Sequence, residues 1–93
     1  VPMLSFTSFY EVIERANNHD LGLSSYICTK SMEKAHRASE LMETGTVAVN
    51  TPLVALAEAP FGGIKQAGYG REGGSMAIKD YLNVKYTHLG LKG

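Results

Sequence analysis

The chain has 93 residues, 44% of them hydrophobic, and its nine basic and nine acidic side chains leave no net charge. This hydrophobic share is too high for a disordered tail, and the lack of a basic stripe or acidic tail argues against nucleic-acid and membrane partners. A single cysteine excludes an internal disulfide and suits a reducing compartment, so we expect a cytoplasmic protein with one small domain.

The first elements in chain order are a short strand and a helix. Residues 3–6 predict the strand because they are mostly apolar and precede a helix start. Ser8 and Glu11 have the spacing of a capping box, and apolar residues then recur at helical spacing as far as Ala16. The turn-forming residues 17–20 predict the end of this helix.

A second helix is expected between two further strands. Residues 23–29 and 46–49 predict the strands, and Ser31 predicts the N-cap of the helix between them. Gly45 stands where a left-handed C-terminal cap is expected. The predicted buried stripe of this helix consists of Ala35, Ala38, Leu41 and Met42.

This order of elements predicts an α/β fold, a three-layer piece with a small, mostly parallel sheet and crossover helices. Three strands leave open sheet edges, which favours further strands beside them. Residues 76–82 have weak helical character, and residues 83–91 alternate well enough to predict a last strand.

The most informative segment is residues 45–74, which holds seven of the ten glycines. Such density predicts either positive φ angles or very close backbone approach. Phe61 is the single aromatic residue held between Pro60 and Gly62, and this is how a loop presents one rigid side chain.

Residues 68–73 match the pattern GxGxxG, which in a dinucleotide-binding unit lies between a buried strand and a helix. No predicted strand directly precedes them, and Asp80 follows too closely to be the acidic residue that usually comes about 20 positions later. We therefore interpret these residues as a turn that lets the chain double back, and not as a phosphate-binding site.

Cys28 could be a nucleophile, but its place at the end of an apolar strand favours a small buried side chain. The three histidines show no metal-ligand spacing, and we expect them to be solvated or hydrogen-bonded; they are His19, His36 and His88.

Together, these motifs resemble the C-terminal part of the aldehyde dehydrogenase superfamily, over nearly the whole chain. The residues that carry the resemblance are Gly45-x-Val47-x-Val49-Asn50, Pro60-Phe61-Gly62-Gly63 with Lys65, Gly68-x-Gly70-Arg71-Glu72, Ala16-Asn17, Gly22-Leu23, Tyr81 and Lys85. Within this superfamily the chain is most similar to succinate-semialdehyde dehydrogenases.

The resemblance implies roles for several residues. Phe61 is expected to wall the channel through which the aldehyde approaches, and residues 51–59 are expected to form the neighbouring wall. Asn50 is expected to fix the turn that leaves the third strand, and Arg71 and Glu72 are expected to be structural. The residue that matches Ala55 is a serine that helps to hold the substrate's distal carboxylate, so alanine there argues against a dicarboxylic semialdehyde; Ala67 likewise replaces a usual serine.

The implied reaction is NAD- or NADP-dependent oxidation of an aldehyde to an acid by a cysteine thiolate. No catalytic, cofactor-binding or metal residue is expected in this chain, because the nucleophile, the base and the cofactor fold would lie upstream. We expect residues 1–82 to belong to the catalytic domain and residues 83–93 to form a strand through which a homo-oligomer assembles. The mid-strand start favours an inactive fragment of that enzyme, and a free-standing interaction module without catalysis is the alternative.

Overall fold

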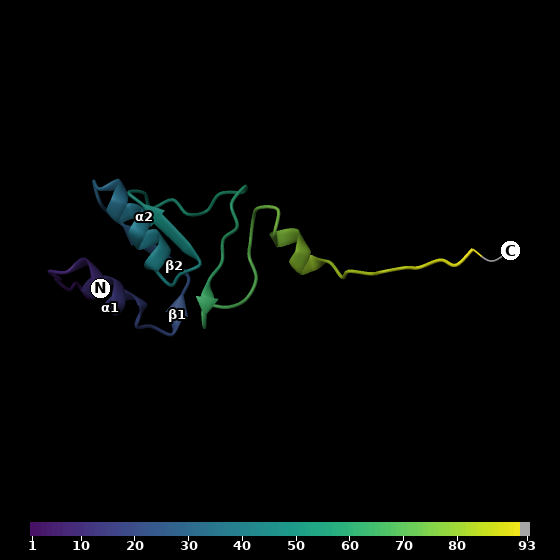
Figure 1. The fold of residues 1–93 in the computed structure, drawn as a ribbon, viewed down its shortest axis with the longest axis horizontal. Coiled ribbons are helices and arrows are strands. Elements are labelled where there is room, and N and C mark those ends of the chain that lie inside the picture. Colours follow the sequence, from purple (N-terminus) through teal and green to yellow (C-terminus); the bar gives the residue numbers. More distant parts are fainter. Residues whose placement is uncertain (92–93) are drawn as a thin grey trace.

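The computed structural model describes residues 1–91. Its α-helices and strands lie in a body at the N-terminal end, from which the C-terminal segment with a short 3-10 helix extends (Figure 1). In chain order they are α1 (Phe9–Asn17), β1 (Leu21–Gly22), β2 (Ser24–Ile27), α2 (Met32–Leu41), β3 (Thr46–Val49), β4 (Ile64–Lys65) and a 3-10 helix (Ala77–Tyr81). The mixture of α and β elements that the sequence predicts is confirmed.

A parallel β-α-β unit is the centre of the fold. β2 pairs in parallel with β3, from Ser24 opposite Thr46 to Ile27 opposite Val49, and α2 makes the crossover. The predicted cap of α2 is confirmed, because the Ser31 hydroxyl accepts the Lys34 N–H at 3.2 Å. The buried apolar side chains are all small, namely Ala35, Ala38 and Ala48.

The predicted stripe of α2 is only half buried. Ala35 and Ala38 are buried, but Leu41 is 40% exposed and Met42 lies beyond the end of the helix. The left-handed cap expected at Gly45 is wrong, because Gly45 is absent from the described residues with positive φ. The chain instead leaves α2 in an extended conformation at Met42.

The small, mostly parallel sheet that the sequence predicts is instead, within residues 1–91, two separate pairs of strands, of which only β2 and β3 are parallel. β1 and β4 form a separate antiparallel pair, with Leu21 opposite Lys65 and Gly22 opposite Ile64. The strand expected at residues 3–6 is wrong, since this segment is exposed and forms no strand. The cap that follows it is confirmed, because Ser8 accepts the Glu11 N–H at 3.4 Å.

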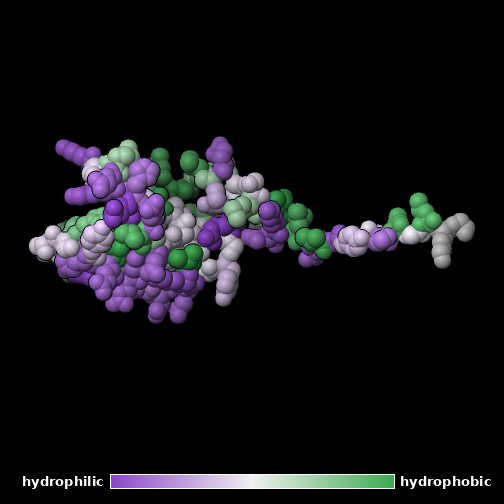
Figure 2. Space-filling view, in the orientation of Figure 1, coloured by the Kyte–Doolittle hydropathy of each residue, from purple (hydrophilic) through white to green (hydrophobic). Residues whose placement is uncertain are grey.

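The end of the chain extends away from the body (Figure 1), which the C-terminal segment contacts at Asp80, the acceptor of the Arg71 N–H at 3.2 Å. Residues 76–82 contain the five-residue 3-10 helix, and residues 83–91 form no strand within this chain. The described chain measures 76 × 25 × 24 Å, with a radius of gyration of 19.1 Å, where about 12 Å is typical of a compact domain of this length. Apolar residues remain exposed at both ends of the extended tail (Figure 2).

The accessible surface also exceeds that of a compact protein. It measures 8156 Å², whereas roughly 5,300 Å² is expected for a folded monomer of this mass. Large apolar side chains contribute to this surface, among them Leu53, Tyr69 and Tyr81, which are 74%, 105% and 86% exposed. Among residues 1–91, no helix is long and apolar enough to cross a bilayer.

Candidate functional site

The segment from Phe61 to Glu72, here called the glycine loop, doubles back on itself. The Phe61 N–H donates to the Glu72 carbonyl and the Glu72 N–H donates to the Phe61 carbonyl, both at 2.7 Å. Within it, φ is +119° at Gly68 and +81° at Gly70. The predicted turn is therefore confirmed.

The geometry of residues 68–73 does not fit a dinucleotide cradle. Such a cradle needs a buried parallel strand that leads directly into an α-helix. Here β4 has two residues and pairs antiparallel, and the helix that follows is a five-residue 3-10 helix. The glycines thus serve the turn.

Close backbone approach accounts for the other glycines in this region. A Cβ atom added to Gly45 would lie 1.9 Å from the Gly62 carbonyl oxygen, and one added to Gly62 would lie 2.5 Å from the Gly70 oxygen. The chain segments at Gly45, Gly62 and Gly70 are therefore packed backbone to backbone beside Phe61. Both predicted reasons for the glycine density, positive φ and close approach, are confirmed, and Gly73 combines them, with a φ of +70° and an added Cβ 2.8 Å from the Ala59 oxygen.

Phe61 is half-buried and borders a hollow of about 300 Å³. Leu23, Tyr69, Arg71 and Tyr81 also line this hollow. The backbone of Phe61 both donates a hydrogen bond to Glu72 and accepts one from it, so the backbone that carries the ring is fixed in place. The hollow is open and its wall combines aromatic, apolar and charged groups.

Arg71 holds the glycine loop together from inside. Its Nη1 donates to the carbonyl oxygens of Gly63 at 2.9 Å and of Gly70 at 2.7 Å. Its backbone N–H donates to Asp80 Oδ2 at 3.2 Å. The structural role predicted for Arg71 is confirmed, and the backbone of Glu72 has such a role through its bonds to Phe61.

Asn50 fixes the turn after β3, as predicted. It adopts a left-handed φ of +56°. Its side-chain Nδ2 donates to the Thr29 carbonyl at 2.8 Å, and its Oδ1 accepts the Thr29 N–H at 2.9 Å. One amide thus joins the carboxyl ends of β2 and β3, at the point where residues 51–59 begin.

The loop of residues 51–59 is irregular and largely exposed. It is tied at its far end, where the Gly74 N–H donates to the Ala57 carbonyl at 2.8 Å. Ala55 is exposed and does not line the hollow beside Phe61. The two residues expected in one substrate channel are therefore not brought into one cavity within this chain.

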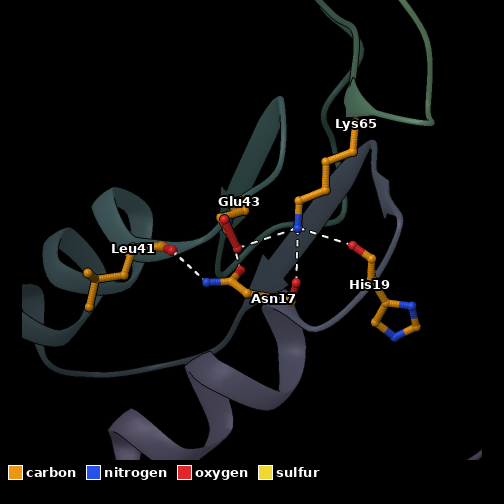
Figure 3. A network of polar contacts seen from close by, with 5 residues as sticks. All are labelled: Asn17, His19, Leu41, Glu43 and Lys65. Carbon is orange, nitrogen blue, oxygen red and sulfur yellow. Dashed lines mark hydrogen bonds and ion pairs between the residues drawn. The ribbon is translucent and has the colours of Figure 1, made fainter.

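A polar network that the sequence analysis missed centres on Lys65 (Figure 3). The Lys65 ammonium donates to the carbonyl oxygens of Asn17 at 2.9 Å and His19 at 3.1 Å, and it lies 3.4 Å from Glu43 Oε2. The Asn17 amide in turn donates to the Leu41 carbonyl and accepts the Glu43 N–H, both at 2.8 Å. Partners up to 48 residues apart leave no local pattern that could have revealed it.

Cys28 is exposed, so the buried position expected for it is wrong. It lies just beyond β2 and lines an apolar groove of about 490 Å³, which also includes Phe9, Ile13, Ala38 and Met42. The groove lies between α1, α2 and β2, and no other part of residues 1–91 fills it. Within residues 1–91, no group of three His, Cys, Asp or Glu side chains is placed to hold a metal ion.

Comparison with known proteins gives concordant results. The profile described as "Aldehyde dehydrogenase family" matches residues 1–87. A 3-sulfolactaldehyde dehydrogenase of Pseudomonas putida is 47% identical over 89 residues, which are 96% of this chain and 18% of that protein. An NADP(+) succinate-semialdehyde dehydrogenase of Escherichia coli is 40% identical over 90 residues, which are 97% of this chain and 19% of that protein.

Solved structures of aldehyde dehydrogenases contain the same fold. An NAD+ complex of an aldehyde dehydrogenase from Bacillus cereus superposes with a TM-score of 0.85 at 45% identity, over 88% of this chain and 17% of that one. The chain thus spans about a fifth of the length of the curated relatives that it matches.

Proposed function

Because the chain belongs to the aldehyde dehydrogenase family, we propose that it forms the C-terminal part of an enzyme that oxidises an aldehyde to a carboxylic acid with NAD or NADP. In this proposal the nicotinamide cofactor accepts the hydride, and the thiolate and the base that act on the aldehyde belong to the rest of the enzyme. Residues 1–82 contribute to its catalytic domain. The task of this chain is to supply one wall of the substrate channel.

Phe61 is the residue that we assign to this wall. The observation that carries the assignment is the attachment of its backbone, with reciprocal 2.7 Å hydrogen bonds to Glu72 and the stacked glycines on its C-terminal side. A ring held in this way can exclude water and orient an apolar substrate body without losing much conformational freedom on binding. Its position beside an open hollow supports the same role.

The substrate, we propose, is a small aldehyde of the semialdehyde type. Support comes from the relatives, which are named for succinate semialdehyde and 3-sulfolactaldehyde and so for aldehydes with a second acidic group. Ala55 has no side-chain hydrogen-bond donor, and Glu58 is the one charged residue of loop 51–59. An acidic group on the substrate must therefore find its cationic or hydroxyl partners in other parts of the enzyme.

The C-terminal segment, we further propose, pairs with a second copy of the enzyme. Residues 83–91 are exposed and extended, and their backbone groups have no partner strand within the described chain. Unpaired backbone N–H and C=O groups of an extended segment gain hydrogen-bond partners when another strand pairs with them. Tyr86 and Leu89 would provide apolar contacts, and Lys85 would oppose open-ended stacking; Lys92, expected to act likewise, lies outside the described residues.

The test of the channel wall is Phe61→Ala in the full-length enzyme. We expect kcat/KM for the aldehyde to fall roughly 10–200-fold, as for other contacts in apolar pockets, while the Kd for the cofactor stays unchanged. Phe61→Leu serves as the matched control because it keeps apolar volume. Its kcat/KM for the aldehyde should fall less than that of Phe61→Ala. Unchanged aldehyde kinetics together with a large drop in thermal stability would show that Phe61 is only a packing residue.

A further inference from the structure

Lys65 adopts an unusual backbone conformation. Its φ is +55°. Among residues 1–91, Lys65 and Asn50 are the two residues other than glycine that have a positive φ. A side chain with a Cβ atom is disfavoured in the left-handed region, and lysine lacks the short polar side chain that eases this for asparagine. A specific interaction of the lysine side chain would explain why it occupies this position.

The Lys65 ammonium supplies that interaction. Its three possible donors are matched by three oxygen atoms, those of Asn17, His19 and Glu43 described above. The Asn17 carbonyl is the last of α1, where the helix dipole favours a positive charge. The Lys65 side chain is only 26% exposed, so solvent screens these contacts less than it would on an open surface.

The network fixes one strand to the ends of two helices. Lys65 comes from β4 and contacts the end of α1, and the Asn17 side chain bonds the Leu41 carbonyl at the end of α2. Figure 3 shows the lysine reaching from β4 towards these helix ends. Without it, the β1–β4 pairing of two residues per strand is a weak attachment for the glycine loop.

We infer that Lys65 is a positioning residue for Phe61: its ammonium fixes β4 on the end of α1 and so holds Phe61, four residues earlier, at its place in the substrate channel. The inference rests on the proposed function. It assigns Lys65 no contact with the aldehyde. Its effect is transmitted through Gly62 and Gly63, whose backbones are packed against neighbouring segments with no space for a side chain.

The experiment measures aldehyde selectivity in the full-length enzyme. The ratio of kcat/KM for a bulky aldehyde, such as benzaldehyde, to that for acetaldehyde reports where the wall lies, and it is independent of the fraction of active enzyme. For Lys65→Met, which keeps the aliphatic stem and removes the donors, we expect this ratio to change roughly three- to tenfold, a part of the effect of losing the ring. Lys34→Met, an exposed lysine on α2, is the matched control and should leave the ratio unchanged.

A double mutant decides whether Lys65 acts through Phe61. If it does, Lys65→Met changes the ratio in the parent enzyme and adds no change in the Phe61→Ala background. A uniform loss for both aldehydes overturns the inference, because a purely structural role lowers both alike. If Phe61→Ala changes the ratio and Lys65→Met does not, the inference fails and the channel wall stands; if Phe61→Ala has no effect, both fail. Should Lys65→Met not fold, Lys65→Asn decides by the same ratio, because asparagine tolerates the left-handed backbone.

Discussion

Gly45→Ala is expected to be one of the most disruptive single substitutions in this chain. The added Cβ would lie 1.9 Å from the Gly62 oxygen, 2.8 Å from the Gly62 carbonyl carbon and 2.9 Å from the Gly63 Cα. Ordinary contact begins at 3.4 Å, so the two backbones must separate by about 1.5 Å. No flexible side chain can absorb this shift. We therefore expect the free energy of unfolding to fall by about 3 kcal/mol, the upper end of the usual range for overpacking.

The matched control is Gly68→Ala, which separates steric contact from backbone conformation. Gly68 has a φ of +119°, but a Cβ there would meet no atom within 4 Å, so only the conformational penalty of about 1–2 kcal/mol is expected. Thermal unfolding of the two full-length variants at one protein concentration and scan rate gives the comparison.

Aldehyde kinetics provide the second measurement for Gly45→Ala. Because Gly62 adjoins Phe61, the shift should lower kcat/KM for the aldehyde as well as the unfolding temperature. The reasoning is refuted if Gly45→Ala unfolds at the same temperature as Gly68→Ala or above it, since the glycine backbones would then not be stacked as described.

Three further predictions concern other parts of the chain. Asn50→Ala should cost roughly 2–4 kcal/mol, from two hydrogen bonds to Thr29 and a left-handed backbone, and Asn50→Gly should cost less because it keeps the backbone; equal unfolding temperatures for the two variants would contradict this. The isolated chain should show no NAD-dependent turnover of a short aldehyde, and activity above that of a denatured sample would overturn the division of roles proposed above. Ending the full-length enzyme at Leu82 should reduce its assembly state in sedimentation equilibrium, whereas an unchanged oligomer would show that residues 83–91 are not at the contact.

Local signals in the sequence determined the parts of this protein that depend on near neighbours along the chain. Ser8 and Ser31 identify helix starts because a cap needs only the next three residues. The β-branched run Thr46–Val49, which stops at Asn50, identifies β3 and the turn that follows it. The hydrogen bonds that hold this turn were not visible in the sequence, because they join Asn50 to Thr29, 21 positions away. The ordered motifs also identified the family, because their spacing is retained along nearly the whole chain.

Only the tertiary structure decided the features that depend on distant partners. A strand needs a neighbour, so residues 3–6 and 83–91 have strand-like patterns but form none in this chain, while the two-residue strands β1 and β4 leave no pattern at all. Glycine density did not reveal that Gly45 serves backbone approach and Gly68 serves a turn. The contact between Lys65 and the end of α1 joins residues 48 positions apart, and such contacts arise from the packing of elements that sequence periodicity alone does not place.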